Sequence, residues 1–600
     1  MTLTYYGVKS VILERNETTT RWPKMDLTNV RSMEIFRKLG LVQGLREQGV
    51  AAHIPYNVRI STGLSRPESI TNWFHPSVNE YRIRIADKND GTMPLEPWQR
   101  ISQAIFEQWL KGRCDESPLI DARFNHRVED LQEVENGARV TVTDQKTGLK
   151  KIILSHYAVG CDGGSSMVRR SLGIPLHGGP IPAYVLLVHF KSRDLSRLHA
   201  QGRFWHLFFV GNEGLTGAAI AQNEVDTWTT HLFLPLEKDS DSISSQEAVE
   251  TSLGGLHGRY PVKIDRVLVR STYRPRIAIA QSYSSSNGRI LLAGDAAHQN
   301  IPTGGYAAVI AGFAEPQLMD SYESERRPVA VDSIEHSGVH MKVHMDVAQI
   351  LQGRAGALDE DSEEGRKLRR ALHEHYQKHN GENIDLGIEM GYRYQSHAIF
   401  TEDSQPPKFS PSAYIPSTYP GSRAPHMYLG DGTPIFDHYG KYFSLVEFSD
   451  GADYGSDLLL KAAELGWTPI KLVRLAGEDH AYSVWGRRLV LVRPDGHVTW
   501  RGDMIKDFAE AQRIVAAIRG VKEVVINAPE TAAPPYQNGV NSYSTTPVES
   551  AVPPKFTSTV GTDAQTEDYQ VERMGDSRFN AKGRPWGAPY CYRHGGMKQQ

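Results

Sequence analysis

The chain has 600 residues, of which 40% are hydrophobic and 23% charged, and its formal net charge is −3. This length exceeds what one hydrophobic core can organise and predicts about three domains. The near-neutral charge gives no electrostatic basis for nucleic acid or an anionic membrane as a partner. The sequence has neither the ~18-residue apolar run of a membrane span nor a signal-peptide pattern.

Cysteine usage indicates a reducing compartment. The three cysteines are Cys114, Cys161 and Cys591, and none of them belongs to a Cys-x-x-Cys pair. This spacing excludes a disulfide framework and a structural zinc site. We therefore predict a soluble, cytoplasmic protein.

The first 175 residues carry the strands and helices of an α/β unit. A short apolar strand is predicted over 8–13, and helical periodicity follows over 28–50, with Gly40 as a local stop. A second amphipathic helix is predicted over 97–114. Alternating strands joined by hairpin turns come next.

The rest of the chain divides by composition. Residues 176–280 hold four β-rich stretches that predict a separate sheet, and 281–400 return to a buried strand and helices. A Pro/Ser-rich linker over 401–412 precedes a smaller α/β unit over 413–528. The last segment, 529–600, is rich in Pro, Ser, Thr and Gly and is predicted to be disordered.

Two stretches of the first unit suggest contacts with a nucleotide. Glu14 ends the first strand, where an acidic side chain can accept hydrogen bonds from ribose hydroxyls. An acidic residue in this place is more often only a solvated turn. In "GCDGGSSMVRRSLGI" a strand runs into Asp162 and Gly163, where glycine permits positive φ and close backbone approach. A plain strand-to-helix turn is the alternative there.

The third stretch is "GRILLAGDAAH", residues 288–298, in which a buried strand ends at Gly294 and Asp295. A carboxylate at this strand end can bind a ribose or ribityl hydroxyl. The turn "PTGG" that follows offers backbone N–H groups to an anionic or carbonyl-rich ligand edge. His298 has no second ligand at metal-binding spacing, so we interpret it as a turn histidine.

Together these stretches resemble the flavoprotein aromatic hydroxylases of the p-hydroxybenzoate hydroxylase fold, in the branch similar to phenol hydroxylase. The resemblance implies an α/β fold with a Rossmann-like FAD-binding domain over 1–175 and 281–400. A β-sheet substrate domain over 176–280 is inserted into it, and a thioredoxin-like domain follows over 413–528. Because this last domain lacks Cys-x-x-Cys, a disulfide oxidoreductase role is not expected.

The resemblance also implies roles for individual residues. Glu14 would bind the adenosine ribose with Arg15 beside it, Arg31 would approach the pyrophosphate, and Gln103 would lie near the cofactor. Asp162 and Gly163 match the "DG" motif near FAD and the NADPH route. The "GD" motif, which holds the ribityl chain of FAD, is matched by Gly294, Asp295, Pro302, Gly304 and Gly305.

The sequence departs from the family pattern in two places. The first strand and its GxGxxG turn, which bind the pyrophosphate, have no counterpart before the strand at 8–13. After Tyr306 the flavin-ring turn and most of a helix have none either. Either errors in the gene model or a real truncation of the protein would explain these gaps. In the second case, a catalytically inactive remnant that acts as a binding protein is an alternative function.

The function implied by the resemblance is an FAD-dependent monooxygenase of secondary metabolism. NAD(P)H and O2 are its co-substrates, and a flavin C4a-hydroperoxide hydroxylates a phenolic or polyketide-derived aromatic ring. Epoxidation, decarboxylative hydroxylation and halogenation on the same scaffold are alternatives, and a homodimer is compatible with the resemblance. No catalytic residue is assigned. Trp205, His206, Trp228 and Tyr273 are candidates for substrate contact, although residues such as the first three are more often core or surface aromatics.

Overall fold

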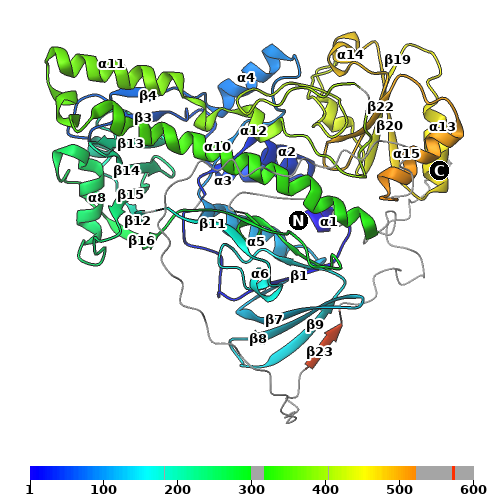
Figure 1. The fold of residues 1–600 in the computed structure, drawn as a ribbon, viewed down its shortest axis with the longest axis horizontal. Coiled ribbons are helices and arrows are strands. Elements are labelled where there is room, and N and C mark those ends of the chain that lie inside the picture. Colours follow the sequence, from blue (N-terminus) through cyan, green and yellow to red (C-terminus); the bar gives the residue numbers. More distant parts are fainter. Residues whose placement is uncertain (24, 182, 299–315, 403, 522–569, 574–600) are drawn as a thin grey trace, which may run out of the picture.

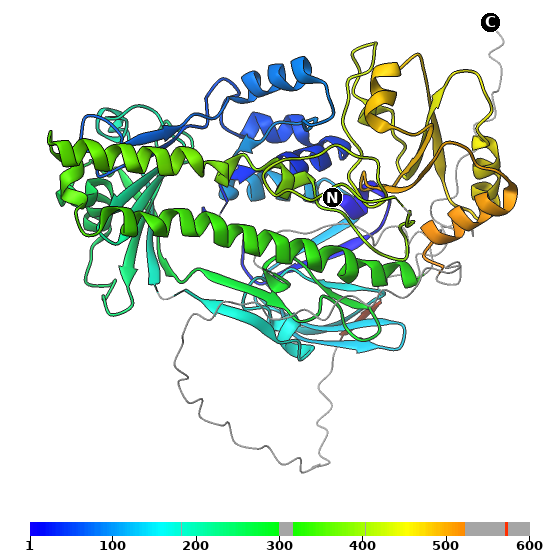
Figure 2. The ribbon, with the colours of Figure 1, turned by 45° about the horizontal axis from the view of Figure 1, so that its top comes forward.

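The computed structural model describes residues 1–23, 25–181, 183–298, 316–402, 404–521 and 570–573. The long helix α10 (Ser321–Leu351) crosses the molecule, from the smaller C-terminal unit to a large sheet on the opposite side (Figures 1 and 2). Within the described part of the chain, every helix is too short or too polar to cross a membrane.

Parallel strand pairs form the base of the first unit. Strand β1 (Ser10–Glu14) pairs with β6 (Ile120–Phe124), and β10 (Ala158–Gly160) pairs with β18 (Ile290–Leu292). All three residues of β18 are fully buried in a shared core. The pairing of β10 with β18 therefore joins the two separated halves of the predicted FAD-binding domain.

The helices of this unit follow the sequence closely, with one exception. Helices α2 (Val30–Lys38) and α3 (Val42–Gln48) are separated at Gly40, whose φ of +72° is readily adopted by glycine. Helix α5 (Gln103–Asp115) begins later than the predicted start at 97. The reason is that β5 (Gln99–Arg100) pairs with the short strand at 27–28.

Short elements surround these pairs. A four-stranded, mostly antiparallel sheet shares a core with β18 and with α6, and an antiparallel pair of strands leads into and out of the large sheet. The bounds are α1 (Thr2–Tyr5), α4 (Val78–Lys88), β7 (His126–Val134), β8 (Gly137–Asp144), β9 (Lys150–Ser155), β23 (Gln570–Arg573), α6 (Met167–Ser171), β11 (Leu176–Pro180) and β17 (Arg276–Ala280).

The large sheet has seven strands in the order β16-β12-β15-β14-β13-β3-β4. Their bounds are β3 (Val58–Ser61), β4 (Thr71–Trp73), β12 (Ala183–Lys191), β13 (His206–Gly211), β14 (Gly214–Ala221), β15 (Thr227–Pro235) and β16 (Arg266–Tyr273). Helix α8 (Ser245–Gly254) covers one face, and α10 packs against β14 from the other. The separate sheet expected at 176–280 is present, but it also takes in β3 and β4, because β3 pairs in parallel with β13.

The C-terminal unit is a four-stranded mixed sheet in the order β20-β19-β21-β22. Its bounds are β19 (Phe443–Ser449), β20 (Ile470–Ala476), β21 (Leu489–Val492), β22 (Val498–Gly502), α13 (Ser456–Leu465), α14 (Asp479–Trp485) and α15 (Phe508–Ile518). Helices α13 and α15 pack on one face and α14 on the other. This sheet with helices on both faces is the arrangement expected of a thioredoxin-like domain.

Two helices between α10 and the C-terminal unit complete the fold. Helix α11 (Glu363–Lys378) runs beside the C-terminal part of α10, and α12 (Leu386–Met390) packs near α2. Their buried residues share a core with β3, β4 and α10. Apart from β23, the segment 529–600 lies outside the described residues.

Candidate active site

A cavity of about 850 Å³ lies where the first unit, α10 and the C-terminal unit meet. Its walls come from α1, α2, the ends of β10 and β18, α10, α12 and the turn between β21 and β22. This volume is within the range of cavities that bind small molecules and cofactors.

The two predicted glycine motifs lie side by side at this cavity. Cys161 follows β10 and Ala293 follows β18, and both residues line the cavity. The neighbouring Gly163 and Gly294 have φ values of +79° and +60°, and a Cβ added to either would meet no atom within 4 Å. Ligands of open α/β sheets bind outside the carboxyl ends of the strands, which is where these glycines lie.

The two acidic residues of the motifs differ in their surroundings. An Asp162 carboxylate oxygen accepts hydrogen bonds from the N–H groups of Met167 (2.7 Å) and Val168 (3.1 Å), at the start of α6. Such a carboxylate satisfies N–H groups that the first turn of a helix leaves unpaired. Asp295 is exposed in a single 3₁₀ turn directly after β18.

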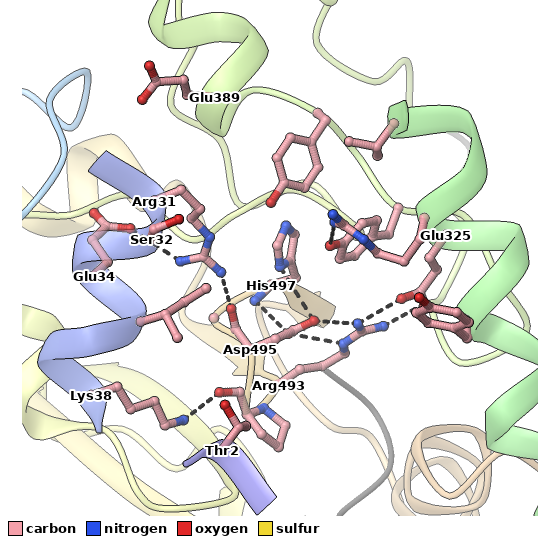
Figure 3. Close-up of a pocket in the computed structure, with 18 of the residues that line it drawn as sticks. Thr2, Arg31, Ser32, Glu34, Lys38, Glu325, Glu389, Arg493, Asp495 and His497 are labelled. Atoms are coloured by element: carbon pink, nitrogen blue, oxygen red, sulfur yellow. Dashed lines mark hydrogen bonds and ion pairs between the residues drawn. The ribbon is translucent and has the colours of Figure 1, made fainter. Parts of the chain in front are cut away.

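Helix α2 carries cationic side chains into the cavity (Figure 3). Arg31 contacts Glu34 on the next turn (3.2 Å) and donates a hydrogen bond to the carbonyl of Asp495. Lys38 lies two turns further along the same helix face and donates to the carbonyl of Pro494. Burial lowers the pKa of Lys38 to about 8, so its charge is sensitive to pH just above neutrality.

The opposite wall joins α10 to the C-terminal unit. Arg493 makes a two-pronged contact with Glu325 of α10, at 2.7 and 2.9 Å, and its guanidinium also reaches Asp495 at 2.6 Å. Although burial raises the pKa of Asp495, Arg493 and His497 outweigh it and hold this pKa well below its usual range. The cavity therefore contains fixed charges of both signs (Figure 3).

Glu389 of α12 is a buried carboxyl at the edge of the cavity (Figure 3). It accepts hydrogen bonds from the Val30 N–H and the Trp98 indole N–H, each at 3.3 Å. Burial raises its pKa to about 7, which these donors only partly offset.

His298 adds a neutral polar group to the cavity wall. Its ring stacks on Tyr283 at a centroid distance of 5.7 Å, and burial lowers its pKa to about 4. Its buried Nδ1 makes no hydrogen bond with any residue that the structure describes. An uncharged imidazole nitrogen of this kind can form a hydrogen bond with a polar atom of a ligand.

Of the predicted cofactor residues that the structure describes, only Arg31 itself lines the cavity, and three lie away from both the cavity and the glycine motifs. Glu14 accepts hydrogen bonds from the backbone N–H (2.7 Å) and the side-chain amide (2.6 Å) of Asn16, and Arg15 is exposed. The Gln103 amide donates to Glu107 at 2.7 Å. Their cofactor contacts stay predictions.

The remaining residues of the "GD" motif, Pro302, Gly304 and Gly305, lie outside the described residues.

Trp205 and His206, both named from the sequence as candidates for substrate contact, share a partner, Asp26, that sequence reasoning missed. Asp26 accepts hydrogen bonds from the Trp205 indole N–H (2.8 Å) and contacts His206 Nε2 at 2.7 Å. Burial raises the pKa of Asp26, but His206 outweighs it and the pKa is lowered. The partners stand about 180 residues apart, so no local pattern could have paired them. Trp228, in contrast, is a core residue on the α8 side.

The comparisons with known proteins decide the family. Residues 1–337 match the family model described as "FAD binding domain", and residues 417–521 match "Aromatic-ring hydroxylase, C-terminal". The chain belongs to the FAD-dependent aromatic-ring hydroxylases. The family, the fold class and the FAD-dependent monooxygenase activity predicted from the sequence are thus confirmed.

Individual relatives and a solved structure support the same conclusion. The FAD-dependent monooxygenase apdD of Emericella nidulans is 47% identical, with 86% of this chain and 88% of the relative covered. The FAD-dependent monooxygenase opdD of Penicillium oxalicum is 44% identical, with 83% and 99% covered. Among solved structures, the flavin-dependent monooxygenase PieE in complex with FAD and substrate is 25% identical, with a TM-score of 0.75 over 87% of this chain and 96% of that one.

The residues at the cavity fit FAD. The two open glycine positions allow a ligand to approach the strand ends, and Arg31 and Lys38 provide positive charge for a diphosphate. The orphaned Nδ1 of His298 provides a polar contact, and apolar side chains such as Ile388 line the walls. This combination of apolar walls and a few placed polar groups is typical of cofactor sites.

Proposed function

We propose that this chain, in the cytoplasm, binds FAD at the carboxyl ends of β10 and β18 and hydroxylates a phenolic or polyketide-derived aromatic compound with NAD(P)H and O2. The observation that carries the proposal is the pairing of the two motif-bearing strands at a cavity of about 850 Å³ faced by Arg31. The family match over residues 1–337 supports it.

The chain's own groups would bind the cofactor through its charged and polar parts. Gly163 and Gly294 leave the backbone open to the ribityl and phosphate region, and Arg31 and Lys38 neutralise the diphosphate. When bound, FAD accepts reducing equivalents from NAD(P)H and activates O2. The β21–β22 turn packs over Arg31 and Lys38, where it would shield a bound ligand from water.

The aromatic substrate would occupy the part of the cavity along α10 and α12. Val329 and Ile388 supply apolar surface there, and the buried phenol of Tyr392 lies between Arg31 and Arg326. These arginines outweigh burial and lower the pKa of Tyr392, so the phenol can take part in proton transfer with a substrate hydroxyl.

The test uses the full chain purified with FAD added. We expect flavin absorption that stays with the protein, NAD(P)H oxidation that is stimulated by a phenolic substrate, and one oxygen atom from labelled O2 in a hydroxylated product. An epoxide or a decarboxylated product would move the assignment to one of the other oxidations. Absence of bound flavin would instead favour the inactive binding protein, and light scattering on the same preparation tests the homodimer.

A further inference from the structure

Three potential metal ligands converge on the wall of the cavity formed by α10. His336 and His340 are four residues apart on this helix and therefore project from the same face. Asp385 reaches them from the residue just before α12. Each of the three offers one ligand atom, and these atoms lie within 4.8 Å of one another.

The distances within this cluster suit a bound ion. His336 Nε2 lies 2.7 Å from an Asp385 carboxylate oxygen and 3.1 Å from His340 Nε2, and His340 Nε2 lies 3.6 Å from the same carboxylate. Adjacent ligand atoms of an ion with bonds of ~2.1 Å are about 3.0–3.4 Å apart. The separation of the two histidine nitrogens falls in this range, and the two separations from the carboxylate oxygen, 2.7 and 3.6 Å, lie on either side of it.

Hydrogen bonding alone leaves this cluster poorly satisfied. The Nε2 atom of His336 faces both the Asp385 carboxylate and His340 Nε2. A neutral ring nitrogen can donate a proton to the first or accept one from the second, but not both. A cation at the centre would instead accept a lone pair from each of the three ligand atoms.

Gly381 leaves room for the carboxylate in this position. A Cβ added to Gly381 would lie 2.4 and 2.5 Å from the two carboxylate oxygens of Asp385, so only glycine admits the carboxylate there. The three side chains are 12–17% exposed, and both histidines line the cavity. The site is therefore preformed and opens toward the cavity.

We propose that His336, His340 and Asp385 bind one divalent transition-metal ion, of the zinc or iron(II) kind. Two imidazoles and one carboxylate are a ligand set that such ions favour, and three protein ligands leave coordination positions open toward the cavity. Water or an anionic oxygen of a cavity ligand completes the coordination. The neighbouring His344 and Glu382, in contact at 2.8 Å, flank the site one turn further along α10.

The experiment measures zinc binding to the full chain, purified without a histidine tag and stripped with a chelator. Equilibrium dialysis should give one tightly bound zinc per chain, and cobalt(II) should give a ligand-field absorption that zinc abolishes. His340→Ala and Asp385→Asn should each weaken zinc binding by at least about tenfold. Circular dichroism and thermal melting establish that each variant is folded.

A second histidine pair gives a matched control. His375 on α11 and His379, the residue just after this helix, are also four residues apart, with ring centroids 5.2 Å apart, and His379 is exposed. His379→Ala should leave zinc binding and the zinc-induced rise in melting temperature unchanged, whereas His340→Ala should abolish that rise. Zinc binding lost in His379→Ala but kept in His340→Ala would overturn the proposal, as would a wild-type chain that binds no zinc.

Discussion

Arg423 of the C-terminal unit and Glu34 of α2 form a buried ion pair, with Arg423 Nε donating to Glu34 at 2.9 Å. The two side chains are only 1% and 2% exposed, and they are separated by 389 residues in the sequence. Glu34 stands on the same helix as Arg31 and Lys38, so this pair fixes the C-terminal unit against the cationic wall of the cavity.

Glu34→Gln should strongly destabilise the protein. The substitution leaves the Arg423 guanidinium buried without its carboxylate, which costs about 3–5 kcal/mol in comparable buried pairs. Urea denaturation followed by tryptophan fluorescence measures the loss. Glu464→Gln, at an exposed position on α13, is the control and should leave the midpoint unchanged. Equal midpoints for Glu34→Gln and the control would show that the pair does not hold the two units together.

Glu389→Gln should change how stability depends on pH. The pKa of Glu389 is raised from 4.5 to about 7, so between these values the folded chain binds a proton that the unfolded chain has lost. The free energy of unfolding therefore falls as pH rises through this window, by on the order of 3 kcal/mol for this carboxyl. Relative to wild type, Glu389→Gln should gain stability at pH 8 and little at pH 4.5. Urea midpoints that differ by the same amount at both pH values would contradict this.

Gly294→Ala should raise the Kd for FAD by more than its loss of stability explains. Alanine is strained at a φ of +60°, by about 1–2 kcal/mol, and its Cβ would fill space that a ligand needs at the strand end. Gly148→Ala is a matched control, because Gly148 has a φ of +75°, equally open surroundings and a place in a distant hairpin. Both variants should lose similar stability, but only Gly294→Ala should raise the Kd for FAD in a fluorescence titration. Equal Kd values would argue against a cofactor at β18.

Arg31→Met should also raise the Kd for FAD, by roughly tenfold to a hundredfold, because a hydrogen bond to a charged group contributes about 1.5–3 kcal/mol. Arg46→Met is the comparison, since Arg46 is a similarly buried arginine paired with Glu96 and does not line the cavity. Calorimetry on the two variants separates loss of a buried ion pair from loss of a ligand contact. Matching Kd values in both variants would count against Arg31.

Local sequence patterns predicted much of the fold. The apolar run at 8–13, the stop at Gly40 and the four β-rich stretches of the large sheet correspond to observed elements. The late start of α5 and the addition of β3 and β4 to the large sheet depend on pairing with distant strands. A local pattern contains no information about such partners.

The same limit applies to the site. The glycine motifs were recognisable because backbone geometry requires glycine at particular points of a short segment. The contacts of Asp26 with His206, of Glu34 with Arg423 and of His336 with Asp385 join residues that are far apart in the sequence. They become visible only once the chain has folded.

Titration of the purified full chain with FAD, followed by its visible spectrum, tests the central claim most directly. The account predicts saturable binding of one FAD per chain, with the flavin absorption bands perturbed by transfer of the flavin from water into the cavity. A spectrum that remains that of free FAD at every concentration, from a chain shown to be folded, would contradict it.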